Sequence, residues 1–191
     1  MRLLGRILSL SVCGGRIDPA KRGKSPIVLV AAEGIRLLKV SVSDVEVDGL
    51  DATEKISESI SASGLHFDVL LARSVPIAGF NLIDPEGLMR RHGIPSIFVL
   101  SEEPDWASVE AALRKHFHDW ERRLEVIRKA GTAHRLGENG EGLYLIECFG
   151  VSPEEALRIV QELAVFGRYP EPLRVCCMVA RAISCALIMR S

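Results

Sequence analysis

Residues 27–47 read IVLVAAEGIRLLKVSVSDVEV, and this stretch decides the fold that the sequence predicts. It opens with a nearly continuous, β-branched apolar run over 27–32, which is typical of a strand buried on both faces. Glu33-Gly34 then predicts a tight turn into a longer strand over 35–47. The apolar alternation of that strand shifts phase between Val42 and Val45, as a β-bulge would cause. The stretch therefore predicts an antiparallel hairpin.

The segments on either side of this hairpin predict a third strand and a helix. Residues 7–12 (ILSLSV) form another strand-like run, and a segment rich in glycine and proline separates them from the hairpin. Downstream, Asp51 and Glu54 have the spacing of a capping box, in which the two side chains cap the first turn of a helix. Gly64 has the residue type that closes such a helix.

The second half of the chain alternates strands and helices. FDVLLA (67–72) and PSIFVL (95–100) are short apolar runs typical of parallel strands, and a helix capped by Asp84 begins between them at Pro85. Two helical stripes, a strand over 143–149 and two closing helices follow. The order predicts an α/β fold of the ribonuclease H-like kind: three antiparallel strands, then a parallel βαβ unit, in a mixed sheet flanked by helices, with extra C-terminal helices.

Composition narrows the class of protein without naming a partner. With 24 Lys and Arg residues against 25 Asp and Glu residues, the 191-residue chain has a formal net charge of −1, which excludes a globally basic nucleic-acid coat protein. Its 48% apolar content is that of a folded globular protein. A chain of this length can bury one large core, so we expect a single domain over residues 1–191.

The cysteines and the last apolar stretch indicate in which cellular compartment the protein is expected. The chain has an odd number of cysteines and no CxxC pair: Cys13, Cys148, Cys176, Cys177 and Cys185. Because most of them lie in apolar stretches, the pattern predicts buried reduced thiols with packing roles, and hence a cytoplasmic protein. Residues 173–189 contain two arginines and fall short of the roughly 20 apolar residues that span a bilayer, so we expect a core helix and no membrane partner.

The acidic residues offer one candidate metal site. Asp48 and Asp51 lie where the third strand meets its helix, so a turn through Gly49 could bring both carboxylates to one edge of the sheet. Carboxylates at strand ends of a ribonuclease H-like sheet bind Mg²⁺ or Mn²⁺ and act on phosphodiesters. The alternative is that Asp51 only caps the helix, together with Glu54. Both interpretations stay open.

A basic loop follows the first strand. Arg16, Lys21, Arg22 and Lys24 could contact the phosphates of a nucleic acid, which would make nucleic acid the partner. The alternative is a solvated surface loop with no ligand. The salt dependence of binding would distinguish the two.

Three motifs carry a resemblance to a known family. VDGLDATEKI (47–56), AGFNLID (78–84) and PEPLR (170–174) resemble the signatures of an archaeal family, domain of unknown function number 99. The resemblance runs from about Arg6 to the last helix. That family is similar to endonuclease V and is assigned a ribonuclease H-like fold, so the resemblance implies descent from a Mg²⁺-dependent nuclease.

The chain departs from the family pattern at three positions. Members usually carry two adjacent aspartates after the first strand, where this chain has Cys13 and Gly14, and many carry an aspartate where this chain has Arg73. A hard divalent ion needs oxygen ligands, and these residues supply none. The departures imply loss of the ancestral two-metal mechanism.

Three hypotheses follow. The first is a degenerate nuclease-fold protein that binds nucleic acid without hydrolysis and needs no cofactor. The second is an active nuclease with a relocated Mg²⁺ or Mn²⁺ site at Asp48 and Asp51. The third is a protein-interaction module whose apolar final helix forms a partner or homo-oligomer surface.

Overall fold

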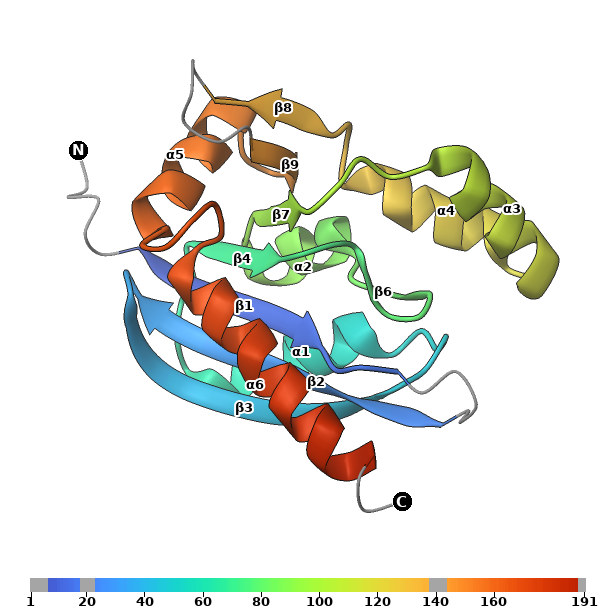
Figure 1. Cartoon of the computed structure of the whole chain (residues 1–191), viewed down its shortest axis with the longest axis horizontal. Helices are drawn as coiled ribbons and strands as arrows, with labels where there is room; N and C mark the ends of the chain where they lie inside the picture. The colour runs from blue at the N-terminus through green and yellow to red at the C-terminus, as the bar shows by residue number, and fades with distance from the viewer. Residues whose placement is uncertain (1–6, 18–22, 138–143, 189–191) are drawn as a thin grey trace.

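The structure is a computed structural model that describes residues 7–17, 23–137 and 144–188. A mixed sheet with helices on both faces forms its centre (Figure 1). Within the described residues the sheet has seven strands in the order β3-β2-β1-β4-β7-β9-β8. The strands are β1 (Leu8–Gly14), β2 (Lys24–Glu33), β3 (Arg36–Glu46), β4 (Val69–Ala72), β7 (Ser96–Leu100), β8 (His134–Leu136) and β9 (Tyr144–Phe149).

The strand directions confirm the predicted order. β2 lies between β1 and β3 and pairs antiparallel with both. β1, β4 and β7 are parallel, so the carboxyl ends of these three strands meet at one edge of the sheet. β9 returns antiparallel to β7, and β8 pairs with β9.

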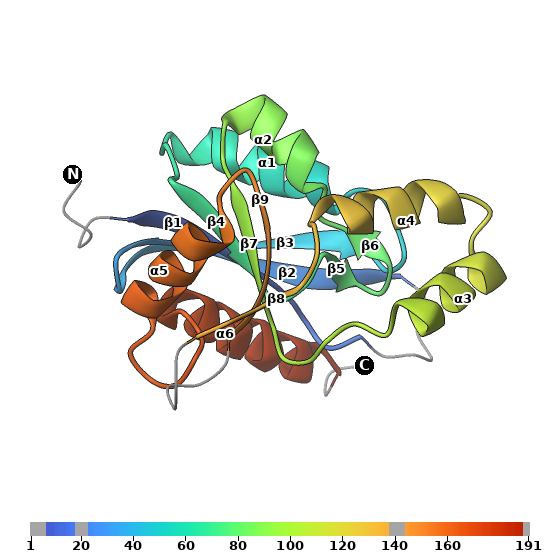
Figure 2. The same cartoon turned by 90° about the horizontal axis from the view of Figure 1, so that it is seen from above.

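The helices cover both faces of the sheet (Figure 2). Helices α1 (Ala52–Ser63) and α2 (Pro85–His92) lie on one face, and α5 (Pro153–Leu163) and α6 (Glu171–Ile188) lie on the other. Helices α3 (Trp106–His116) and α4 (Trp120–Lys129) lie side by side at one end. One hydrophobic core fills each face, because the strand side chains alternate between them. No helix within the described ranges has the length and apolar character needed to cross a membrane.

Two local features differ from the prediction. The prediction of a bulge between Val42 and Val45 is wrong. The register of β3 against β2 runs unbroken from Lys39 to Glu46, and it shifts instead between Ala31 and Ala32 of β2. The apolar pattern does not indicate a bulge here because β3 is an edge strand, and its apolar residues Val40 and Val42 are exposed instead of facing a core. The sequence also gave no sign of a short hairpin formed by β5 (Pro76–Ala78) and β6 (Asn81–Leu82).

Small side chains let α6 approach the sheet closely. Ser9 and Ser11 of β1 are fully buried, and strand alternation turns them toward the same face as Cys13, which is the face that α6 covers. The thiol of Cys176 on α6 donates to the backbone oxygens of Val28, at 3.1 Å, and Ser11, at 3.4 Å. The predicted packing role of Cys176 is therefore confirmed, and the close contact fixes α6 beside the end of β1.

Candidate functional site

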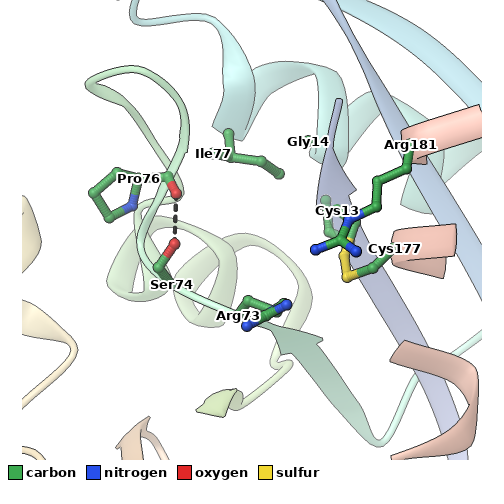
Figure 3. A pocket seen from close by; sticks show the side chains of 9 residues that line it. Cys13, Gly14, Arg73, Ser74, Pro76, Ile77, Cys177 and Arg181 are labelled. Atoms are coloured by element: carbon green, nitrogen blue, oxygen red, sulfur yellow. Dashed lines mark hydrogen bonds between the residues drawn. A yellow bond between two sulfur atoms is a disulfide. The ribbon is translucent and has the colours of Figure 1, made fainter. Parts of the chain in front are cut away.

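A cavity of about 190 Å³ opens at the carboxyl ends of β1 and β4, beside α6 (Figure 3). Cys13 and Gly14 end β1, Arg73 follows β4, and Cys177 and Arg181 come from α6. The cavity thus gathers the three positions at which the chain departs from the family pattern. Of the described residues, nine line it, and none of these is an aspartate or a glutamate.

A disulfide joins Cys13 to Cys177 at this cavity. The two Cα atoms are 5.2 Å apart, within the usual range for a disulfide, although 164 positions separate the cysteines in the sequence. The prediction of reduced thiols is therefore wrong for these two residues. The bond arises because β1 directs Cys13 toward the face that α6 covers, where Cys177 lies one residue after the buried Cys176.

Two arginines turn their charges toward the same opening (Figure 3). The Arg73 guanidinium lies 4.8 Å from the centre of the Tyr169 ring, and its Nη2 donates to the Tyr169 hydroxyl at 3.3 Å. Arg181 is exposed on α6, four residues after Cys177. Among the described residues, neither arginine forms an ion pair with a carboxylate. Within the described residues, the opening therefore carries positive charge that no carboxylate pairs.

A second cavity of about 120 Å³ adjoins the first and shares Arg73, Cys177 and Arg181 with it. Tyr169 and Arg174, from the YPEPLR segment, form part of its wall. Nε of Arg174 donates to a carboxylate oxygen of Glu171 at 2.8 Å, so its charge is paired. Arg181 belongs to none of the motifs that the sequence shows. The spacing of Arg174, Cys177 and Arg181 along one helical face could have indicated it.

Gly14 leaves no room for a side chain. A Cβ atom placed there would collide with the backbone carbonyl of Ile77 in β5. The β5–β6 hairpin therefore closes against the end of β1, at a position where the family resemblance leads us to expect an aspartate. A carboxylate at residue 14 would require this hairpin to move.

The groups at the cavity do not fit a hard divalent cation. Mg²⁺ and Mn²⁺ take oxygen ligands, above all carboxylates. Cys13 is engaged in a disulfide, Gly14 has no side chain, and Arg73 is a cation. These groups supply neither the negative charge nor the coordination geometry that such an ion needs.

Asp48 and Asp51 are not among the described residues that line this cavity. Asp48 Oδ1 accepts from the backbone N–H of Phe80 at 2.8 Å. Asp51 Oδ1 accepts from the Glu46 N–H at 3.1 Å and from Asn81 Nδ2 at 2.6 Å. Both carboxylates therefore hold the β5–β6 hairpin against the end of β3, and their predicted metal binding stays a prediction.

The predicted caps at Asp51 and Asp84 are wrong in their chemistry. Each residue occupies the N-cap position of its helix, but neither side chain makes a capping hydrogen bond. Asn81 caps α1 instead, because its Oδ1 accepts from the Ala52 N–H at 3.0 Å. The Asp84 N–H donates to Thr53 Oγ1 at 2.8 Å. The DGLDATE and AGFNLID motifs therefore bind each other.

The basic loop is only partly described. Arg16 is exposed, and its backbone N–H donates to Ser184 Oγ on α6 at 2.9 Å, which places it one turn of the helix from Arg181. Lys24 is exposed at the start of β2. Lys21 and Arg22 lie outside the described residues. The start of this loop thus adds a positive charge near the cavity.

Sequence comparison places these features in a family. Residues 13–184 match the model of a family described as endonuclease dU. A UPF0215 protein of Pyrococcus furiosus is 35% identical over 173 residues, covering 88% of each chain. A UPF0215 protein of Methanosarcina acetivorans is 39% identical over 145 residues, covering 74% of this chain and 73% of the relative.

Solved structures share the fold. A protein of unknown function from Archaeoglobus fulgidus superposes with a TM-score of 0.83 at 27% identity, over 93% of this chain and 98% of that one. Endonuclease V of Ciona intestinalis, crystallised with DNA containing an inosine, gives a TM-score of 0.60 at 12% identity, over 95% of this chain and 87% of that one. The likeness confirms the predicted ribonuclease H-like fold.

Proposed function

The chain belongs to the endonuclease dU family, and from this premise we propose that it binds nucleic acid at the β1–β4 edge without hydrolysing it. Arg73 and Arg181 contact a backbone phosphate there. The observation that carries the proposal is a pair of guanidinium groups at the cavity, neither of which forms an ion pair with a carboxylate among the described residues.

Electrostatics favours an anionic ligand at this cavity. Two like charges that face one opening repel each other, and an anion between them removes that cost. Guanidinium groups also match the geometry of phosphate oxygens, which they bind through paired hydrogen bonds. The Tyr169 ring holds Arg73 in place, so less side-chain freedom is lost when an anion binds.

The relatives make a nucleic acid the favoured source of that phosphate. The endonuclease V of Ciona intestinalis was crystallised with DNA, and this chain shares its fold. Arg16 and Lys24 add positive charge to the loop that follows β1. Such charges contact successive phosphates of a strand and contribute affinity without sequence preference.

Fluorescence anisotropy with labelled single- and double-stranded oligonucleotides tests the proposal. We expect Arg73→Ala and Arg181→Ala each to weaken binding about tenfold and to lower the slope of log affinity against log salt by about 0.9, the value for one lost phosphate contact. Arg128→Ala is the matched control, because it removes an exposed arginine of α4 that pairs with Glu110.

Two results would contradict this function. One is an affinity that all three arginine variants lower equally, since the effect would then report net charge alone. The other is Mg²⁺- or Mn²⁺-dependent cutting of a deoxyuridine- or inosine-containing strand that Asp48→Ala abolishes, which would favour the relocated nuclease site.

A further inference from the structure

We propose that Cys13 and Cys177 form a thiol–disulfide switch that controls the anion site: the closed disulfide holds the two arginines in the binding arrangement, and its reduction weakens binding. The inference rests on the proposed function for its ligand, a phosphate group. It assigns to the two cysteines a role beyond the loss of metal ligands.

The disulfide joins the two structural units that carry the arginines. Cys13 lies on β1, which pairs in parallel with β4, the strand that leads into Arg73. Cys177 lies on α6 one turn before Arg181, so the two side chains project from the same helical face. The covalent bond therefore limits how far Arg181 can move from Arg73.

The part of α6 that bears Arg181 packs on the sheet through small side chains, because Ala180 and Ser184 are buried, while its outer face is exposed. The first half of the helix is anchored by the fully buried Cys176 and by Leu173, which is 1% exposed. Beyond Arg181, Cys185 and Leu187 are exposed, and Leu187 is 52% accessible. Ser184 Oγ accepts from the Arg16 N–H, a bond to a loop and not to the sheet. Among the described residues, the disulfide is the one covalent link between α6 and the sheet, and it lies at the cavity.

A reductant can reach the bond through the opening that admits the anion. Cys177 lines both cavities, whereas Cys13 is only 5% exposed. The neighbouring Cys176 does not compete in the exchange, because it is fully buried and burial raises the pKa of its thiol to about 12. Attack on the Cys177 sulfur is therefore the accessible route.

The chemistry balances with a dithiol as the reductant. One thiolate of the dithiol attacks Cys177 Sγ, the Cys13–Cys177 bond breaks, and Cys13 leaves as a thiolate that takes a proton. The second thiol of the reductant then attacks the mixed disulfide and releases Cys177, which also takes a proton. Two electrons reach the protein, and the dithiol leaves as its own disulfide.

Binding measured in both redox states tests the switch. The full chain is prepared oxidised or treated with dithiothreitol, and thiol alkylation with mass spectrometry records the state of each cysteine. A labelled oligonucleotide is the probe, with inorganic phosphate and pyrophosphate as competitors to distinguish a nucleic acid from a small phosphate. We expect the reduced protein to bind about tenfold more weakly, within the range of typical allosteric couplings.

Cysteine variants provide the matched controls. Cys13→Ser and Cys177→Ser should bind like the reduced protein and should not respond to dithiothreitol. Cys185→Ser removes an exposed thiol of the same helix and should keep the full response. Because wild-type protein is measured in both states, the test does not depend on the folding of any variant.

The outcomes separate the switch from the function. Equal affinity in the two states, or alkylation of all five cysteines in the oxidised preparation, overturns the switch and leaves nucleic-acid binding intact. Absence of oligonucleotide binding in both states overturns the proposed function. Loss of the redox response in Cys185→Ser would assign the effect to another thiol.

Discussion

Replacing Asn81 with leucine should lower the free energy of unfolding by about 3 kcal/mol, because the change removes three hydrogen bonds and leaves the buried Ala52 N–H without its acceptor. Asn81 is fully buried. Its Oδ1 accepts from the Ala52 N–H, and its Nδ2 donates to the Glu46 carbonyl at 2.8 Å and to Asp51. Leucine has nearly the same volume but can satisfy none of these groups. Urea denaturation followed by circular dichroism measures the loss.

Ser59→Ala is the control for this prediction. Ser59 Oγ donates to the Lys55 carbonyl within α1, and we expect its removal to change stability by less than about 0.5 kcal/mol. A loss of the same small size for Asn81→Leu would show that Asn81 does not hold the two motifs together.

Replacing Glu147 with glutamine should stabilise the protein by about 3 kcal/mol at pH 8 and have little effect at pH 4. Glu147 lies on β9, is 2% exposed, and its Oε1 has no hydrogen-bond partner among the described residues. Burial raises the pKa of its carboxyl from 4.5 to about 7. A raised acid pKa means that the folded state binds the proton more tightly, so stability falls as the pH rises from 4.5 through 7.

Unfolding by urea at pH 4, 6 and 8 measures this effect. Glu121→Gln on α4 serves as the control, because Glu121 is exposed and should give nearly the same stability change at each pH. If Glu147→Gln changes stability equally at pH 4 and pH 8, or destabilises the protein at pH 8, then the buried carboxyl has a partner that lowers its pKa.

The order of elements could be predicted because each rests on a local pattern. The apolar runs at 7–12, 27–32 and 95–100 are strands within three residues of their predicted bounds. Gly64 closes α1 in the left-handed conformation, and Ser152 caps α5 through the Glu155 N–H. Each of these signals involves residues that are close together in the chain, so it can be recognised from the sequence alone.

The features that the sequence could not reveal depend on distant partners. Asp51 has the spacing of a cap, yet Asn81, thirty residues away, does the capping. The hairpin of β5 and β6 is too short to show the alternation of apolar and polar residues that marks a strand. Its Gly79 is needed for a close approach, because a Cβ there would collide with Asp48 Oδ1.

The candidate site was predicted in part. Cys13, Gly14 and Arg73 were identified as departures from a family pattern, and the structure brings all three to one cavity. The sequence indicates only a packing role for Cys177 and no role for Arg181, because the sequence of a helix does not reveal which strand end the helix faces. Only the crossing of α6 over β1 brings these residues to the site.

Anomalous diffraction from crystals of the oxidised protein soaked in MnCl₂ tests the central claim most directly, namely that an anion site has replaced the metal site of a nuclease fold. We expect no manganese peak within about 2.5 Å of Cys13, Gly14 or Arg73, because these residues supply no oxygen ligand from a side chain. A manganese ion coordinated at that edge of the sheet would contradict the claim.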